Sequence, residues 1–115
     1  MPFFIDSYSF GILKIGDKIF TNDLVILPEK IIPNWWRAKG HQLSLEDLSC
    51  LGDTPLDCLI IGSGYSGVLK VPEEVKIAIE KKGLKILVTK SAAAVQKYNE
   101  LAQNFRVALA IHLTC

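Results

Sequence analysis

The feature that most constrains this 115-residue sequence is an apolar run that leads directly into a glycine-rich segment. The apolar residues 59–61 are followed at once by Gly62, Ser63 and Gly64. A short, continuous apolar run bounded by glycines is typical of a buried strand in a parallel sheet. Glycines at the end of such a strand let the backbone approach a ligand closely. The stretch therefore predicts an α/β protein with a candidate site at residues 62–64.

Gly62, Gly64 and Gly67 also match the G-x-G-x-x-G pattern of dinucleotide-binding proteins. In those proteins the glycines open a helix directly, so that its N-terminus holds the pyrophosphate. Here the next helix is expected only from Pro72, and no acid for a ribose follows the strand at 85–89. The Gly-Lys-Ser/Thr sequence of a phosphate-binding Walker loop is missing as well. We therefore expect no bound cofactor.

The second half of the chain alternates between strand and helix. Apolar periodicity and end signals predict a strand at 57–61, a helix at 72–82, a strand at 85–89, a helix at 91–104 and a strand at 106–113. Strands that alternate with helices across short loops form a central, mostly parallel sheet.

The first half is richer in strands. Alternating residues and turn signals predict strands at 8–15, 18–20 and 23–27, which form an N-terminal β-meander. A two-residue strand at 31–32 and a short helix at 44–51 follow. The expected fold is a compact three-layer α/β protein, one domain over residues 1–115, with a mixed, mostly parallel central sheet.

A candidate pocket follows from this arrangement, because ligands of such sheets bind at the carboxyl ends of the strands. The 62–64 loop lies at one such end, and Ser91 follows the neighbouring strand as the expected N-cap of a helix whose free N–H groups favour an anion. Asn99 is expected to bond the backbone of the loop, and Trp36 or His41 to close the cavity. The simpler reading is that the glycines make a turn and Ser91 only caps a helix.

The charge and composition of the chain disfavour several classes of function. With 13 Lys and Arg against 12 Asp and Glu, the net charge of +1 does not favour nucleic-acid binding. No segment is apolar for long enough to suggest a membrane span or a signal peptide, so we expect a cytoplasmic protein. The two histidines and three cysteines show no ligand spacing, and we expect no metal site.

Three segments resemble one family of small proteins. Residues 59–64, the run from Thr89 to Leu101 with its Tyr98-Asn99 pair, and the run from Arg106 to Ala110 follow the family's pattern in order and spacing. The family is the domain of unknown function typified by the human mitochondrial complex I assembly factor 3, with bacterial and archaeal relatives. The chain departs from it at Phe105, where the family often has glycine.

The resemblance implies a three-layer α/β fold, no established enzymatic activity, and action through protein partners. Our leading interpretation is a non-catalytic interaction or assembly-type protein with a small pocket at residues 62–64. The alternative is an enzyme or binding protein for a small anionic ligand held by this loop and Ser91. The sequence leaves the partner unidentified and homo-oligomerisation open.

Overall fold

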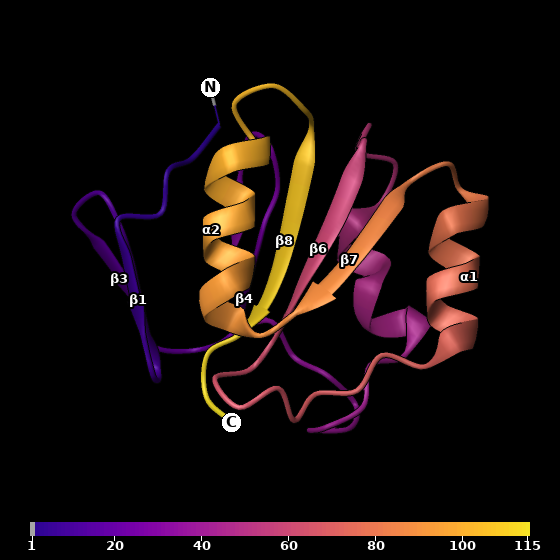
Figure 1. Cartoon of the computed structure of the whole chain (residues 1–115), viewed down its shortest axis with the longest axis horizontal. Helices are drawn as coiled ribbons and strands as arrows, with labels where there is room; N and C mark the ends of the chain where they lie inside the picture. The colour runs from indigo at the N-terminus through magenta and orange to yellow at the C-terminus, as the bar shows by residue number, and fades with distance from the viewer. Residues whose placement is uncertain (1) are drawn as a thin grey trace.

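The computed structural model describes residues 2–115, and Met1 lies outside the described part. Its centre is a five-stranded sheet in the order β5-β4-β8-β6-β7 (Figure 1). β6 pairs in parallel with β7 and β8, whereas β4 runs antiparallel to β8 and to β5. These strands are β4 (Leu24–Ile26), β5 (Ile31–Ile32), β6 (Cys58–Ser63), β7 (Lys85–Thr89) and β8 (Val107–His112).

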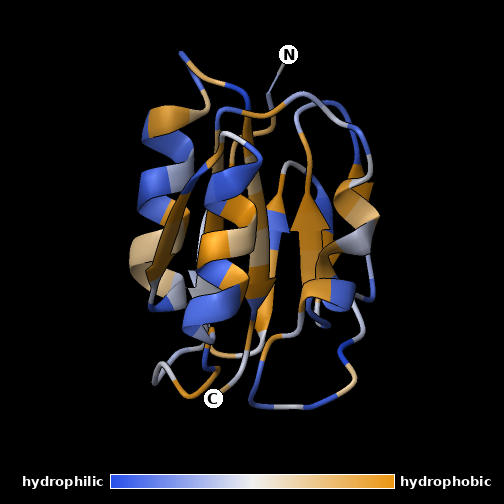
Figure 2. Cartoon of the chain, turned by 90° about the vertical axis from the view of Figure 1, so that its right-hand side faces the viewer, coloured by the Kyte–Doolittle hydropathy of each residue, from blue (hydrophilic) through white to orange (hydrophobic). Residues whose placement is uncertain are grey.

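The two central strands of the sheet are fully buried. All residues of β6 and β8 are buried, because both strands have a neighbour on each side and a layer on each face. Figure 2 shows hydrophobic colouring along the strands, with hydrophilic colouring on the outward faces of the helices. Strands that alternate in neither burial nor polarity are typical of a sheet covered on both faces.

Two hydrophobic clusters separate the molecule into layers. One face of the sheet packs against α2 (Ser91–Leu101), with Tyr98 fully buried, and against the N-terminal segment. The other face packs against α1 (Glu73–Lys81), the 3-10 helix η1 (Leu45–Leu51) and Trp35. The fold class expected from the sequence is thus confirmed, as a three-layer α/β domain with a mixed central sheet.

Both helices follow ordinary end signals. α1 begins just after Pro72, carries acids in its first turn, and has Lys81 in its last turn. Acids at the N-terminus and cations at the C-terminus both complement the helix dipole. Gly83, with φ of 87°, then turns the chain towards β7, in a conformation that other residues seldom adopt.

A separate three-stranded antiparallel sheet precedes the central one. It consists of β1 (Ser7–Ser9), β2 (Ile12–Ile15) and β3 (Lys18–Phe20). The single strand predicted at 8–15 is wrong, because a turn at Phe10 and Gly11 divides it. The segment predicted at 23–27 as the third strand of the meander instead forms β4 of the central sheet.

Other boundaries differ slightly. The strand predicted at 57–61 continues to Ser63, so Gly62 pairs with both Thr89 and Ile111 within the sheet. The last helix ends at Leu101 rather than near Asn104. None of the helices formed by residues 2–115 has the length and apolar character that crossing a membrane requires.

Candidate functional site

The glycine segment and the start of α2 meet at the carboxyl ends of β6 and β7, as predicted. The Gly64 N–H donates to Ser91 Oγ at 2.9 Å, and the Ser91 N–H donates to the Gly64 carbonyl at 3.0 Å. Ser63 Oγ donates to the Thr89 carbonyl at 3.0 Å. The two segments therefore hold one another through paired hydrogen bonds that stay within the chain.

The space beside the glycines is filled by the end of the chain. A Cβ on Gly64 would overlap the backbone of Cys115, and the φ of 108° lies in the region that favours glycine. A Cβ on Gly62 would lie 2.8 Å from Ile111 Cγ1. The glycines thus permit close packing of the chain on itself, and Thr114 accepts a hydrogen bond from Tyr65 at 2.8 Å across the same loop.

Ser91 does not have the predicted capping role. It is the first residue of α2, and Lys90 is the N-cap. Fully buried, its hydroxyl donates to the His112 carbonyl at 2.6 Å while it accepts from Gly64. Ser91 Oγ therefore joins the start of α2 to the ends of β6 and β8. It does not make the hydrogen bond to the N–H groups of the first helical turn that was expected of an N-cap.

Asn99 is also placed differently from the prediction. Its amide forms two hydrogen bonds with the backbone of Ile5, one to the N–H and one to the carbonyl, each 2.9 Å long. The predicted bond to the glycine loop is therefore wrong, and Asn99 instead fixes the N-terminal segment onto α2. This paired geometry explains why an amide stands in the middle of a helix, where its propensity is poor.

The two tryptophans have opposite surroundings. Trp35 is buried, and its Nε1 donates to the Asp47 carbonyl at 2.8 Å. Trp36 is 77% exposed. His41 is exposed too, and its carbonyl accepts from the Lys70 N–H at 2.9 Å. Trp36 lines a hollow together with Thr114. The atoms nearest to the place of a Cβ on Gly62 or Gly64 belong to Ile111, Ser91, Thr114 and Cys115. The glycines are thus packed by these residues, where Trp36 or His41 was expected to close a cavity.

A buried charged cluster at the same edge was not predicted from the sequence. Asp23 Oδ2 lies 2.9 Å from Arg37 NH1 and 2.8 Å from His112 Nδ1, and its Oδ1 accepts from the Leu113 N–H at 2.8 Å. The guanidinium of Arg37 also lies 4.8 Å from the centre of the Trp35 ring. The cluster links the start of β4, the segment 34–42 and the end of β8.

His112 lies at the end of β8 but not at the edge of the sheet. β8 is central in the sheet, and His112 is buried against Asp23. Its Nδ1 is also 3.2 Å from Arg37 NH2, so this one nitrogen faces both a carboxylate and a guanidinium. The arrangement orients the imidazole and neutralises the buried carboxylate.

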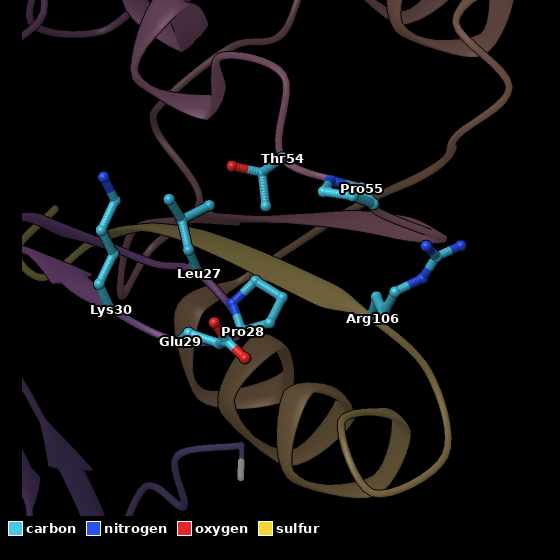
Figure 3. A pocket seen from close by; sticks show the side chains of 7 residues that line it. All are labelled: Leu27, Pro28, Glu29, Lys30, Thr54, Pro55 and Arg106. Carbon is cyan, nitrogen blue, oxygen red and sulfur yellow. The ribbon is translucent and has the colours of Figure 1, made fainter.

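Among the several hollows formed by residues 2–115, two lie at opposite ends of the sheet. Figure 3 shows the one at the amino ends of β6 and β8, of about 610 Å³, where Arg106 stands on the rim. The other, of about 500 Å³, lies beside the charged cluster at the carboxyl ends. The first is lined by Leu27, Pro28, Glu29, Lys30, Thr54, Pro55 and Arg106, and the second by Thr21, Asn22, Asp23, Asn34, Trp35, Trp36 and Thr114.

Large aromatic side chains stand exposed around the carboxyl ends. Phe10 and Tyr65 are 54% and 56% exposed, and their rings meet edge to face with centroids 5.7 Å apart. Trp36 and Thr114 line the same hollow, and Thr114 also bonds Tyr65. We call Phe10, Trp36 and Tyr65, which surround the last residues of the chain, the aromatic edge.

The thiols of Cys50 and Cys58 have surroundings that do not favour reactivity. Burial raises the pKa of the Cys58 thiol, which disfavours the reactive thiolate, and the same holds for Cys50. Within residues 2–115, no three His, Cys, Asp or Glu side chains are grouped so that they could hold a metal ion.

A comparison with protein families identifies the chain. The sequence model described as "Protein of unknown function (DUF498/DUF598)" matches residues 5–112. The chain belongs to this family. The match spans the glycine segment, the charged cluster and both helices, and the resemblance noted from the sequence is confirmed.

Solved structures share the whole fold. The conserved hypothetical protein PH1505 from Pyrococcus horikoshii OT3 is 28% identical, with a TM-score of 0.85 over 96% of this chain and 98% of that one. A protein described as an outer membrane protein from Bartonella henselae is 24% identical, with a TM-score of 0.82 over 99% and 97% of the two chains. A protein named MT938 is 23% identical, with a TM-score of 0.78 over 98% and 99%. The latter two likenesses show the fold alone.

Proposed function

We propose that this protein is a non-catalytic interaction or assembly-type factor that binds a protein partner through the aromatic edge. The observation that carries the proposal is the gathering of Phe10, Trp36 and Tyr65, all largely exposed, at one end of the sheet. Exposed aromatic clusters are a common mark of protein–protein interfaces, in which such rings are enriched and supply much of the binding energy.

The aromatic edge rests on a rigid base, which favours binding. Tyr65 is held by its backbone bond to Thr114, and the Gly11 N–H next to Phe10 donates to the Leu113 carbonyl at 2.8 Å. The buried Asp23–Arg37 pair fixes the segment that carries Trp36. Preorganised side chains lose little conformational entropy on association, so more of the contact energy is retained as affinity.

The alternative, a small anion held by the glycine loop and Ser91, would require a rearrangement. The Gly64 N–H and the Ser91 hydroxyl, which were its expected donors, already bond within the chain. An anion at this place would have to displace those bonds and the Cys115 backbone that packs on Gly64. The exposed aromatic edge needs no such rearrangement, and this difference favours the interaction role.

The proposal is tested with a partner captured from the source cells, identified, and then purified for titration. Replacing two rings in the variant Phe10→Ser/Tyr65→Ser is expected to weaken the purified pair about tenfold or more, since interface aromatics often act as hot spots. Isothermal titration calorimetry measures the dissociation constants of the variant and of the wild type.

Phe105→Ser is the matched control, because Phe105 is 54% exposed but lies before β8, at the opposite end of the sheet. It is expected to bind the partner as the wild type does. Equal affinity for the wild type and the double variant would refute the proposal, as would an equal loss in the Phe105→Ser control.

A further inference from the structure

Three exposed lysines border the aromatic edge. Lys39 and Lys70 lie on the segments that follow Trp36 and Tyr65, and Lys90 lies between β7 and α2. None of the three takes part in an ion pair formed among residues 2–115. We call Lys39, Lys70 and Lys90 the basic rim.

Backbone contacts keep the basic rim at this end of the sheet. Gln42 forms bridges with both Lys39 and Lys70, and the Lys70 N–H donates to the His41 carbonyl at 2.9 Å. The Lys90 side chain packs against Gly67, where its Cγ would lie 3.3 Å from a Cβ. The rim and the aromatic rings are therefore carried by loops that bond one another.

No free acid offsets these lysines on the same loops. Residues 34–42 and 64–70 contain neither Asp nor Glu. The nearest carboxylate in the hollow, that of Asp23, is already engaged by Arg37, His112 and the Leu113 N–H. The Asp47 carboxylate also reaches segment 34–42, but it accepts hydrogen bonds from the Ala38 and Ser44 N–H groups at 3.2 and 2.9 Å. The backbone oxygen of Cys115 likewise accepts from the Ser66 and Val68 N–H groups. The three lysines of the basic rim are therefore the exposed charges on these loops that have no ion-pair partner among residues 2–115.

Resting on the proposed interaction function, we infer that the partner presents an acidic segment that also contains a large apolar residue. Its Asp or Glu side chains would pair with the basic rim, while the apolar side chain would pack beside Phe10, Trp36 and Tyr65. An apolar centre with a charged rim is the ordinary arrangement of a protein interface, and complementary charge sets specificity and the association rate.

The geometry favours a protein segment over single-stranded nucleic acid. Stacking of bases needs open ring faces arranged along a basic groove. Phe10 and Tyr65 instead pack edge to face, at 76° between their planes, so they do not form a continuous stacking platform. A nucleic-acid ligand also calls for a broad basic excess, whereas this rim has three lysines.

The test selects random peptides displayed on phage that bind the wild-type protein but not its Phe10→Ser/Tyr65→Ser variant. We expect the enriched peptides to be net acidic and to contain a large apolar residue. The triple variant Lys39→Glu/Lys70→Glu/Lys90→Glu should bind a selected peptide about tenfold more weakly or worse, because like charges then face one another. Raising the salt from about 50 mM to about 500 mM should weaken wild-type binding as well.

The control is Lys18→Glu/Lys30→Glu/Lys85→Glu, which changes the net charge equally through exposed lysines away from the aromatic edge. It should retain wild-type affinity. Enriched peptides that are neutral or basic, or equal losses in both triple variants, would overturn the acidic partner while leaving the interaction function standing. Tighter binding of an oligothymidylate than of the selected peptide would overturn the choice of a protein ligand. A failure to enrich any peptide would count against the aromatic edge itself.

Discussion

Gly64 shows at the scale of one residue why the space beside the glycine segment is filled by the chain itself. Its φ is 108°, and the backbone of Cys115 occupies the place of a side chain. Gly64→Ala would add both conformational strain and a steric overlap with backbone that cannot move aside cheaply. We expect a loss of about 2–4 kcal/mol in the free energy of unfolding, measured by urea denaturation.

The variant Gly83→Ala separates the cost of conformational strain from the cost of steric overlap. Gly83 also has a positive φ, 87°, but no atom lies within 4 Å of the place where a Cβ would be added. This variant carries only the strain, so we expect a loss of about 1 kcal/mol. If Gly64→Ala were no more destabilising than Gly83→Ala, the close packing of Cys115 on the loop would be contradicted.

Asp23 and Asp57 form ion pairs of equal length in different surroundings. The shortest N–O distance is 2.9 Å in both, but the Asp23–Arg37 side chains are 16% and 6% exposed, against 39% and 58% for Asp57–Arg106. Asp23→Asn would leave the Arg37 cation buried without its carboxylate. We expect a loss of about 3 kcal/mol in urea denaturation at neutral pH, because an unpaired buried charge is poorly solvated.

Asp57→Asn is the exposed counterpart and should cost much less, since water screens and solvates the remaining charge. Hydrogen bonds from the Arg106 side chain, and then from its backbone, lower the pKa of Asp57 in the folded protein below the ordinary value of 3.8. Its contribution is therefore present above that value and is lost as the pH falls through the lowered pKa. The wild type and Asp57→Asn should converge in stability in that acid range, and a difference that grew there would contradict the assignment.

At the scale of elements, one side chain joins the N-terminal sheet to α2. Asn99 bonds both backbone groups of Ile5, just before β1. Asn99→Ala would leave these two groups without their partner, at a cost of about 1–3 kcal/mol. Hydrogen exchange read by NMR should show faster exchange of the Ile5 amide, with little change for the amides of β6.

Gln103→Ala is the control for Asn99→Ala, because Gln103 bonds the Asn99 carbonyl at an exposed position just after α2. It should leave the exchange of the Ile5 amide unchanged. Uniformly faster exchange across the central sheet in Asn99→Ala would show that the residue supports the whole fold and not the attachment of one segment.

The helices and strands whose ends are set by capping residues, glycine or proline were predicted well from the sequence. The helix ends near Pro72 and Gly83 and the strand at 85–89 follow from capping residues and apolar runs. The first half was harder, because β4 pairs with β8, more than 80 residues away in sequence, and such pairing leaves no local trace. The turn at Phe10 and Gly11 was missed because the apolar alternation continues across it.

The site depended on the same distant pairing at the scale of the whole molecule. The register that sets Leu24 opposite Ile111 also brings Asp23 beside His112, so the charged cluster could be anticipated only once β4 and β8 were known to be neighbours. The contact between Gly64 and Ser91 was predictable, because the ends of adjacent parallel strands meet. The filling of that space by Thr114 and Cys115 was not, since it depends on the path of the chain after β8.

The complete arrangement also decides how the molecule responds to a dinucleotide. α1 begins at Glu73, six residues after Gly67, so no helix N-terminus stands at the glycines to hold a pyrophosphate. The loop backbone is engaged with Ser91 and Cys115. We therefore expect no change in the melting temperature when NAD or FAD is added to the protein in a thermal-shift assay. A ligand present at about 100 times its dissociation constant would add about 2.7 kcal/mol, which raises the melting temperature of a domain of this size by several degrees. Such a rise would contradict the prediction and would show that the protein binds a dinucleotide. If the rise were absent in the variant Gly64→Ala, the dinucleotide would be assigned to the G-x-G-x-x-G segment.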